Sequence, residues 1–253
     1  MSGQLTSRER VMRSVAGRDV DRVPVMFRAE RELIQILRAH FGVEDLDSFF
    51  GADLVFAHQG CPQDRLPDLS AAGEADDVDR MAWPDRSIFD MAGIERRLTE
   101  ARATGRAVCA GVWASIFTAS RRVMGEERYL VAMYESPDLI RRVVERLTDA
   151  YLDMNEALFS RFASLMDIFY FGSDFGTQAS LFVSPDLYRA FFKPQMRRLV
   201  EHAKGYGLPV MFHTCGAVGP IVEDLIDIGV DILDPIQVSA AGMMRRITLR
   251  PWS

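Results

Sequence analysis

The sequence predicts an α/β protein built on a parallel sheet, and three observations support this. Short apolar runs alternate with longer segments in which apolar residues recur every three or four positions. At 210–237 a strand pattern, a helix pattern and a second strand pattern follow one another, as in a parallel crossover unit. Pro220 suits the first turn of that helix and Gly229 suits its end.

The same patterns place the other elements along the chain. A capping box at Thr6 and Glu9 begins the first helix. Six strands are expected at 23–27, 53–57, 107–113, 167–178 (with its exit loop), 209–215 and 231–237. Further helices are expected at 33–41, 94–103, 126–135, 136–162 and 184–205, the last kinked near Lys193 by Pro194. Leu33, Ile34, Leu37 and Phe41 form one apolar stripe along the helix at 33–41, and 62–90 is a polar excursion.

The strand count falls short of a closed barrel. A (β/α)8 barrel needs eight strand–helix units. This chain offers about six, and after Gly242 its sequence becomes arginine-rich without a clear helix–strand pair. We therefore expect an incomplete barrel-type domain over 1–243 and an arginine-rich tail of different character over 244–253. We expect that a truncation or a change of reading frame accounts for the missing strand–helix units.

Composition bounds the class of protein. With 48% hydrophobic residues, 26% charged residues and a formal net charge of −6, the 253-residue chain favours a globular domain and argues against a nucleic-acid binder. No apolar run approaches the ~20 residues of a membrane span, and no signal-peptide pattern precedes the first helix. Three scattered cysteines predict reduced thiols and a cytoplasmic protein.

The strongest chemical signal is the pair His213 and Cys215. Residues two apart on a strand face the same side, and Gly216 then permits a tight turn. In parallel α/β units the chemistry lies at the carboxyl ends of the strands, which is where this pair falls. The plainer interpretation is two small buried residues at the mouth of a barrel.

Two long stretches carry a resemblance. FHTCGAVGPIVEDLIDIGVDILDPIQVSAAGM at 212–243 and FGSDFGTQASLFVSPDLYRAFFKPQMRRL at 171–199 resemble the uroporphyrinogen decarboxylase superfamily. The opening LTSRERVMRSVAGRDVDRVPVMF is also similar to the start of its members. The resemblance implies a TIM barrel and an enzyme, because the superfamily contains porphyrinogen decarboxylases and zinc-dependent methyltransferases.

The methyltransferase branch implies a metal at the paired residues. In it, a His-x-Cys pair and a distant cysteine hold zinc, which here assigns His213 and Cys215 as ligands. The family's distant cysteine has no match in this chain, so Cys109, Cys61 and His58 are the candidates for a third ligand. The resemblance further implies a methylcorrinoid, carried by a corrinoid protein, as methyl donor and a thiol as acceptor.

Other polar residues follow the strands. Asp174 ends the strand before FGT and is expected to be catalytic or to line the site, unless it only caps a loop. Gln178 and Gln237 are expected to bind substrate as polar liners of the pocket. Arg28 is a candidate for binding a substrate carboxylate, as in the decarboxylases, or else forms a surface ion pair with Glu30.

The sequence thus favours a zinc methyltransferase that moves a methyl group from a methylcorrinoid to a thiol. The first alternative is a metal-free uroporphyrinogen decarboxylase. The arginine-rich loop that follows the first strand in the decarboxylases is matched here only by Arg28, which disfavours this alternative. The second is an inactive truncated barrel, or one that acts only by pairing with another subunit. We expect a small-molecule substrate, no nucleic-acid or membrane partner, and a homo-oligomer as one option.

Overall fold

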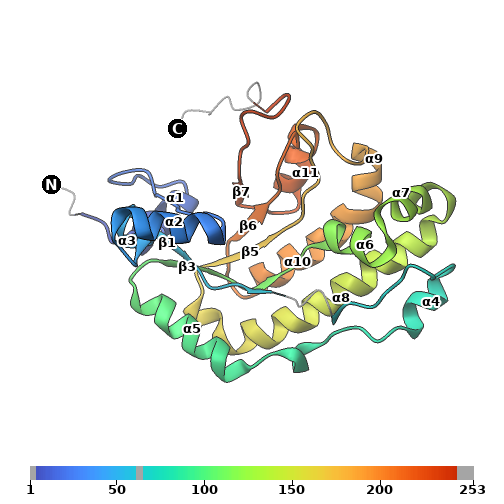
Figure 1. Ribbon diagram of the computed structural model, residues 1–253, viewed down its shortest axis with the longest axis horizontal. Helices are drawn as coiled ribbons and strands as arrows, with labels where there is room; N and C mark the ends of the chain where they lie inside the picture. Colours follow the sequence, from blue (N-terminus) through green and yellow to red (C-terminus); the bar gives the residue numbers. More distant parts are fainter. Residues whose placement is uncertain (1–3, 61–64, 244–253) are drawn as a thin grey trace.

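The computed structural model describes residues 4–60 and 65–243, and a parallel sheet lies at its centre (Figure 1). The sheet has five strands in the order β1-β3-β5-β6-β7. These are β1 (Leu54–Phe56), β3 (Ala107–Ala110), β5 (Ile168–Gly172), β6 (Val210–His213) and β7 (Ile232–Asp234). A short parallel pair, β2 (Gln59–Gly60) and β4 (Val112–Trp113), extends beyond β1 and β3. The described strands form an open arc of a TIM barrel, as predicted.

Helices surround the arc. They are α1 (Ser7–Val15), α2 (Arg31–Phe41), α3 (Leu46–Phe49), α4 (Ala75–Arg80), α5 (Met91–Ala103), α6 (Ile116–Met124), α7 (Glu126–Glu135), α8 (Pro137–Phe162), α9 (Pro185–Leu187), α10 (Lys193–Gly205) and α11 (Val222–Asp227). Short 3-10 turns lie at η2 (Arg86–Ile88), η3 (Ala163–Leu165) and η5 (Gly219–Ile221). A π-helical turn, η4 (Tyr188–Phe192), directly precedes Lys193. The kink that Pro194 predicts near Lys193 stays a prediction. Among the described residues, no helix has the length and apolarity needed to cross a membrane.

The two faces of the sheet bury different residues because side chains alternate along a strand. Phe169 and Phe171 point outward into the large core beneath α8 and α10. Ile168 and Tyr170 point to the inner face, which α1 covers at one end through Val11. The inner cluster consists of Val11, Leu54, Ala107, Cys109, Ile168, Tyr170 and Met211. Cys109 therefore packs as a small apolar residue inside the arc.

Buried ion pairs fasten α1 to the amino ends of the strands. Asp53, fully buried just before β1, accepts hydrogen bonds from Arg10 Nη1 and Arg22 Nη1, each at 2.6 Å. Asp167, just before β5, accepts from Arg8 Nε at 2.8 Å and from Arg102 Nη1 at 2.7 Å. Acids at this end of the sheet are thus neutralised and hydrogen-bonded, as buried charges must be. They stabilise the fold rather than perform chemistry.

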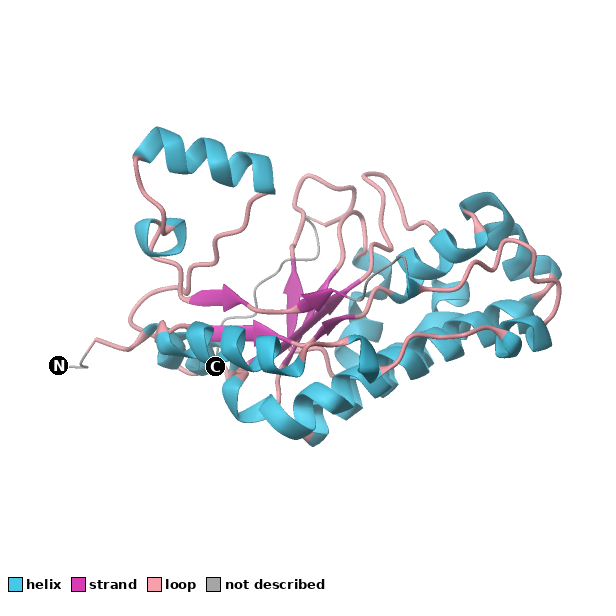
Figure 2. Ribbon diagram, turned by 60° about the horizontal axis from the view of Figure 1, so that its bottom comes forward, coloured by secondary structure: helices cyan, strands magenta, loops and turns pink. Residues whose placement is uncertain are grey.

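One expectation for the N-terminal region is wrong. Residues 23–27 form no strand: Val25 O accepts one hydrogen bond from Asp53 N, but Val23 is 79% exposed. Helix α2 forms where the apolar periodicity places it, yet none of its residues is buried. It stands away from the sheet together with α3 (Figure 2). Amphipathic spacing correctly predicted the helix but could not specify what its apolar side would contact.

A matched pair of leucines tests this difference. Leu147 in α8 is fully buried, whereas Leu33 in α2 is 45% exposed. Leu147→Ala should lower the free energy of unfolding by about 2–5 kcal/mol, because it leaves a cavity. Leu33→Ala should change it by less than about 1 kcal/mol. Urea unfolding of the two variants beside the parent measures both values, and equal losses would show that α2 packs against the core in solution.

Candidate metal centre at the carboxyl ends of the strands

Three potential metal ligands meet just beyond the ends of β5 and β6. They are the carboxylate of Asp174, the imidazole of His213 and the thiol of Cys215, and their donor atoms all lie within 4.8 Å of one another. His213 Nε2 is 3.5 Å from Asp174 Oδ1 and 3.6 Å from Cys215 Sγ. All three residues are half-buried. The sequence predicted that His213 and Cys215 share one face; it did not predict that Asp174 joins them.

These distances suit a tetrahedral ion. Bonds of about 2.0–2.2 Å to nitrogen or oxygen and about 2.3 Å to sulfur separate neighbouring ligands by about 3.4–3.6 Å at the tetrahedral angle. The measured separations from His213 Nε2 to Asp174 Oδ1 and to Cys215 Sγ have these values. One nitrogen, one sulfur and one carboxylate oxygen are also ligands that zinc accepts. Two of the three ligand separations therefore fit a tetrahedral zinc site, and the donor atoms of Asp174 and Cys215 lie within 4.8 Å of each other.

The backbone brings these side chains together through a contact between two loops. Cys215 lies in the turn after β6 rather than on the strand, and its N–H donates to Asp174 Oδ1 at 2.9 Å. Gly216 follows with φ +89°, and a Cβ on it would lie 2.5 Å from Thr177 O. A Cβ on Gly176, in the loop after β5, would lie 2.5 Å from Cys215 O. Only glycines allow the two loops to approach this closely.

A second carboxylate supports the imidazole from the other side. Asp234, at the end of β7, lies beside His213 in the register of β6 and β7. Its Oδ2 is 3.3 Å from His213 Nδ1 and also accepts from Tyr170 Oη at 2.8 Å and from Arg28 Nη1 at 3.0 Å. Asp234 is not among the site residues predicted from the sequence, because the strand was expected to extend to Gln237. An end at 234 would have marked an acid at the carboxyl end of a barrel strand.

The charges of the site determine its protonation when no metal is bound. Burial alone would lower the pKa of His213, but hydrogen bonds to Asp174 and Asp234 outweigh it and raise that pKa to about 9. The hydrogen bond from His213 holds the pKa of Asp174 below its ordinary value. Burial and the nearby Asp174 carboxylate raise the pKa of the Cys215 thiol. Metal binding must therefore displace protons from His213 and Cys215.

Arg28 does belong to this region, but its ion pair is not the one expected. It pairs with Asp234 rather than with Glu30, and its guanidinium carbon lies 5.3 Å from the ring centres of both Phe56 and Tyr170. Its side chain remains 41% exposed and lines a cavity of about 500 Å³ between the α2–α3 segment and β1. Arg28 thus connects the donor group to an open cavity.

Two of the other predicted third ligands, Cys109 and His58, do not join the donor group. Cys109 is fully buried in the inner cluster. His58 packs near Trp113, with ring centres 5.6 Å apart, and Trp113 in turn packs near His213. Burial lowers the pKa of His58. Cys61 lies outside the described residues. Within the part of the chain that the structure describes, Asp174 is the residue that completes a group of three.

The two glutamines take different places. Gln237 Oε1 accepts a hydrogen bond from Gly216 N at 2.8 Å, so this amide supports the loop of Cys215. Gln178 is exposed, and its backbone oxygen accepts from Ala241 N. Neither residue is among those that line the cavities of about 540 and 500 Å³ in the described part of the chain. Their expected contacts with substrate remain predictions.

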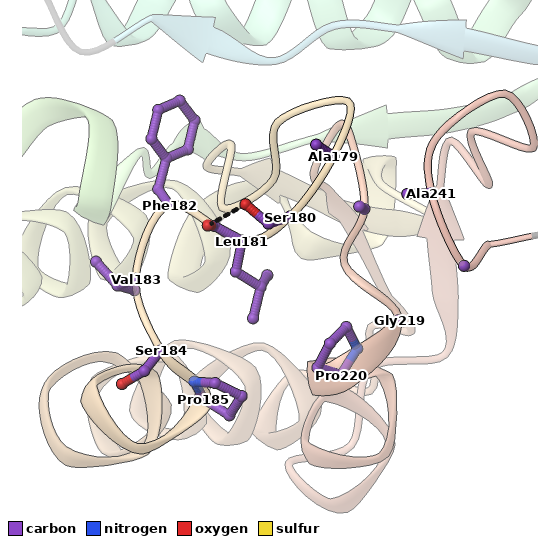
Figure 3. A pocket seen from close by; sticks show the side chains of 12 residues that line it. Ala179, Ser180, Leu181, Phe182, Val183, Ser184, Pro185, Gly219, Pro220 and Ala241 are labelled. Atoms are coloured by element: carbon purple, nitrogen blue, oxygen red, sulfur yellow. Dashed lines mark hydrogen bonds between the residues drawn. The ribbon is translucent and has the colours of Figure 1, made fainter.

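A second cavity, of about 540 Å³, opens beside the loop of Cys215 (Figure 3). Its walls are largely apolar, with Leu181 projecting between Phe182 and Pro220. Ser180 Oγ donates to Leu181 O at 3.0 Å, and Ser184 Oγ accepts from Leu187 N at 3.2 Å, so these hydroxyls serve the local backbone. None of the described residues that line it is titratable. We therefore place the chemistry at the donor group and not in this cavity.

Fold and site together define a barrel protein with a group of potential metal ligands at the carboxyl ends of its strands. A profile of the family described as Uroporphyrinogen decarboxylase (URO-D) matches residues 49–236. This match covers most of the chain, and the chain belongs to that family. The resemblance seen in the sequence is thereby confirmed.

Individual relatives are more distant. Uroporphyrinogen decarboxylases from two strains of Thermus thermophilus are each 32% identical over 114 residues, which is 45% of this chain and 30% of theirs. The chain thus matches less than a third of the length of these curated relatives. A solved methyltransferase from Methanosarcina mazei aligns with 91% of this chain and 76% of its own, with a TM-score of 0.58 and 18% identity. That likeness confirms the barrel fold.

Thiol labelling tests the different burial of the cysteines. Burial and nearby carboxylates raise the pKa of Cys109, so its thiol should resist alkylation in the native metal-free protein. Cys215 is half-buried and should react. Mass spectrometry after iodoacetamide treatment should show a native label that Cys215→Ser removes and Cys109→Ala leaves. Native labelling of Cys109 would contradict the buried position.

The raised pKa of His213 predicts a pH-dependent stability of the chelator-treated protein. The folded pKa of about 9 exceeds the ordinary value of 6.5, so this group stabilises the fold fully below pH 6.5. That contribution is lost as the pH rises through the folded pKa of about 9. The difference in unfolding free energy between the parent and His213→Gln should therefore shrink over this interval. A difference that stays constant from pH 6.5 to beyond about 9 would refute the ion pairs of His213 with Asp174 and Asp234.

Proposed function

We propose that this chain is a metal-dependent methyltransferase that transfers a methyl group from a methylcorrinoid to a thiol. The observation that carries the proposal is the convergence of Asp174, His213 and Cys215 at tetrahedral spacing. A decarboxylase of this superfamily has no need of such a donor group. The short match to the curated relatives makes substrate and partners part of the proposal as well.

The residues hold the metal and organise its surroundings. Asp174, His213 and Cys215 would bind one zinc ion, with Asp174 taking the role for which Cys109, Cys61 and His58 were considered. Zinc bound there would lower the pKa of a substrate thiol, so that it reacts as a thiolate near neutral pH. The methyl group then forms a bond to this sulfur, while the electron pair of the broken carbon–cobalt bond stays on the corrinoid.

The surrounding residues control access to the sulfur. The ring of Trp113 lies 5.8 Å from that of His213 and covers one side of the imidazole with an apolar surface. Apolar walls strengthen the electrostatic interactions within the site by excluding water. The methylcorrinoid is the larger reactant, and we propose that a corrinoid protein delivers it to the open carboxyl end of the barrel.

The alternative is a metal-free decarboxylase, which is favoured by the names of the two curated relatives. That reaction needs free arginines for the substrate carboxylates. Arg28, the one arginine that matched the expected loop, is engaged by Asp234 and by two aromatic rings. The geometry therefore supports the methyltransferase better.

Zinc binding separates these functions. The purified chain should bind about one zinc ion, because three good ligands are in place. Cys215→Ser and Asp174→Asn should each weaken binding by about tenfold or more in competition with a chromophoric chelator. Cys109→Ala is the matched control and should bind as the parent does. A folded parent chain that binds no zinc, checked by circular dichroism, would rule out the zinc methyltransferase and favour the decarboxylase.

A further inference from the structure

Asp234 is the point at which three donors converge beside the metal-ligating group. A single oxygen, Oδ2, contacts His213 Nδ1, Tyr170 Oη and Arg28 Nη1 at 3.3, 2.8 and 3.0 Å. The carboxylate is nearly buried, with 8% of its side chain exposed. A buried carboxylate is costly unless it is paired and hydrogen-bonded, and these donors meet that need.

The contact with Asp234 favours one tautomer of His213 once the imidazole has lost its second proton. An imidazole that donates Nδ1–H to a carboxylate has its lone pair on Nε2. His213 Nε2 is the nitrogen that lies near Asp174 and Cys215. Strand pairing builds this arrangement in, because Asp234 on β7 stands opposite His213 on β6. The side chains of both residues follow the inner-face alternation of their strands.

Resting on the methyltransferase proposed above, we propose that Asp234 is a positioning residue of the metal centre and that Tyr170 and Arg28 act through it. Asp234 is not itself in the donor group, so it works by orienting His213 and increasing its basicity. Tyr170 is fully buried on β5 and donates to Asp234. Arg28 donates both to Asp234 and, through a short hydrogen bond, to the Tyr170 hydroxyl oxygen.

The arrangement also predicts how the effects of substituting these residues combine. Arg28 and Tyr170 reach the imidazole through the same oxygen of Asp234. Removing either donor should therefore matter only while the carboxylate is present. A residue that merely supported the fold would not show this dependence.

The test measures zinc affinity in a set of single and double variants. Asp234→Asn should weaken zinc binding by about 10- to 100-fold, as loss of an outer partner of a metal-bound histidine does. Tyr170→Phe and Arg28→Gln should each weaken it by a smaller factor. In the Asp234→Asn background, the same two changes should have no further effect, because residues that act through one group are not additive.

Matched controls and a second readout exclude a general structural effect. Tyr188→Phe removes a buried hydroxyl that contacts Met196 Sδ. Arg38→Gln removes an arginine that lines the same cavity of about 500 Å³ as Arg28 but donates a hydrogen bond to Glu44 O. Both controls should bind zinc as the parent does. With Co²⁺ in place of zinc, the visible bands of a tetrahedral thiolate site should weaken in Asp234→Asn at saturating metal, while the far-UV circular dichroism of the metal-free variant stays that of the parent.

The outcomes separate the two proposals. A parent chain without zinc would defeat the proposed function itself. If the parent binds zinc but Asp234→Asn binds equally well with an unchanged Co²⁺ spectrum, the positioning role is wrong and the proposed function stands. Fully additive losses in the double variants would show that Tyr170 and Arg28 act independently of Asp234, which would also overturn the inference.

Discussion

The backbone contact between the loops after β5 and β6 determines the candidate site. Because Gly176 and Gly216 carry no side chain, the two loops touch directly. This contact lets Cys215 N–H bind the carboxylate of Asp174 and places the acid beside a thiol 41 residues later in the chain. Parallel pairing of β6 with β7 then adds Asp234 on the far side of His213. The donor group is thus a product of strand register and loop packing, not of one local motif.

Aspartates at the two ends of the sheet have opposite roles for physical reasons. At the amino ends, Asp53 and Asp167 are each bound by two arginines and fasten the first helix to the strands. At the carboxyl ends, Asp174 and Asp234 flank one imidazole, and Arg28 adds a second positive charge at Asp234. The partner of Asp174 is thus a titratable imidazole rather than an arginine, and a His213 that gives up its proton leaves this carboxylate able to bind a cation. The same residue type therefore stabilises one end of the sheet and prepares the other for a ligand.

The sequence predicted much of this structure because local signals and the global fold agree along most of the chain. Strand patterns for β1, β3, β5, β6 and β7 and the long helix α8 were recognisable from periodicity and capping. The strand expected at 23–27 does not form and the apolar stripe of α2 is exposed for one reason. Periodicity predicts an element, whereas the contacts of that element depend on which other segments of the chain pack beside it. The site shows the same limit. His213 and Cys215 are close in sequence, but Asp174 and Asp234 join them only through the sheet.

Arg28 gives the centre a connection to the outside. Its guanidinium is shared between a buried carboxylate and an open cavity, so an anion in that cavity would compete with Asp234 for the same positive charge. A ligand that draws Arg28 away would leave Asp234 with one donor fewer, so that Asp234 would orient His213 less firmly and weaken the hold of His213 on a metal. Because such coupling is reciprocal, the metal would change the affinity for that anion by the same factor. Anion binding in the cavity and metal binding at the centre would then be thermodynamically linked.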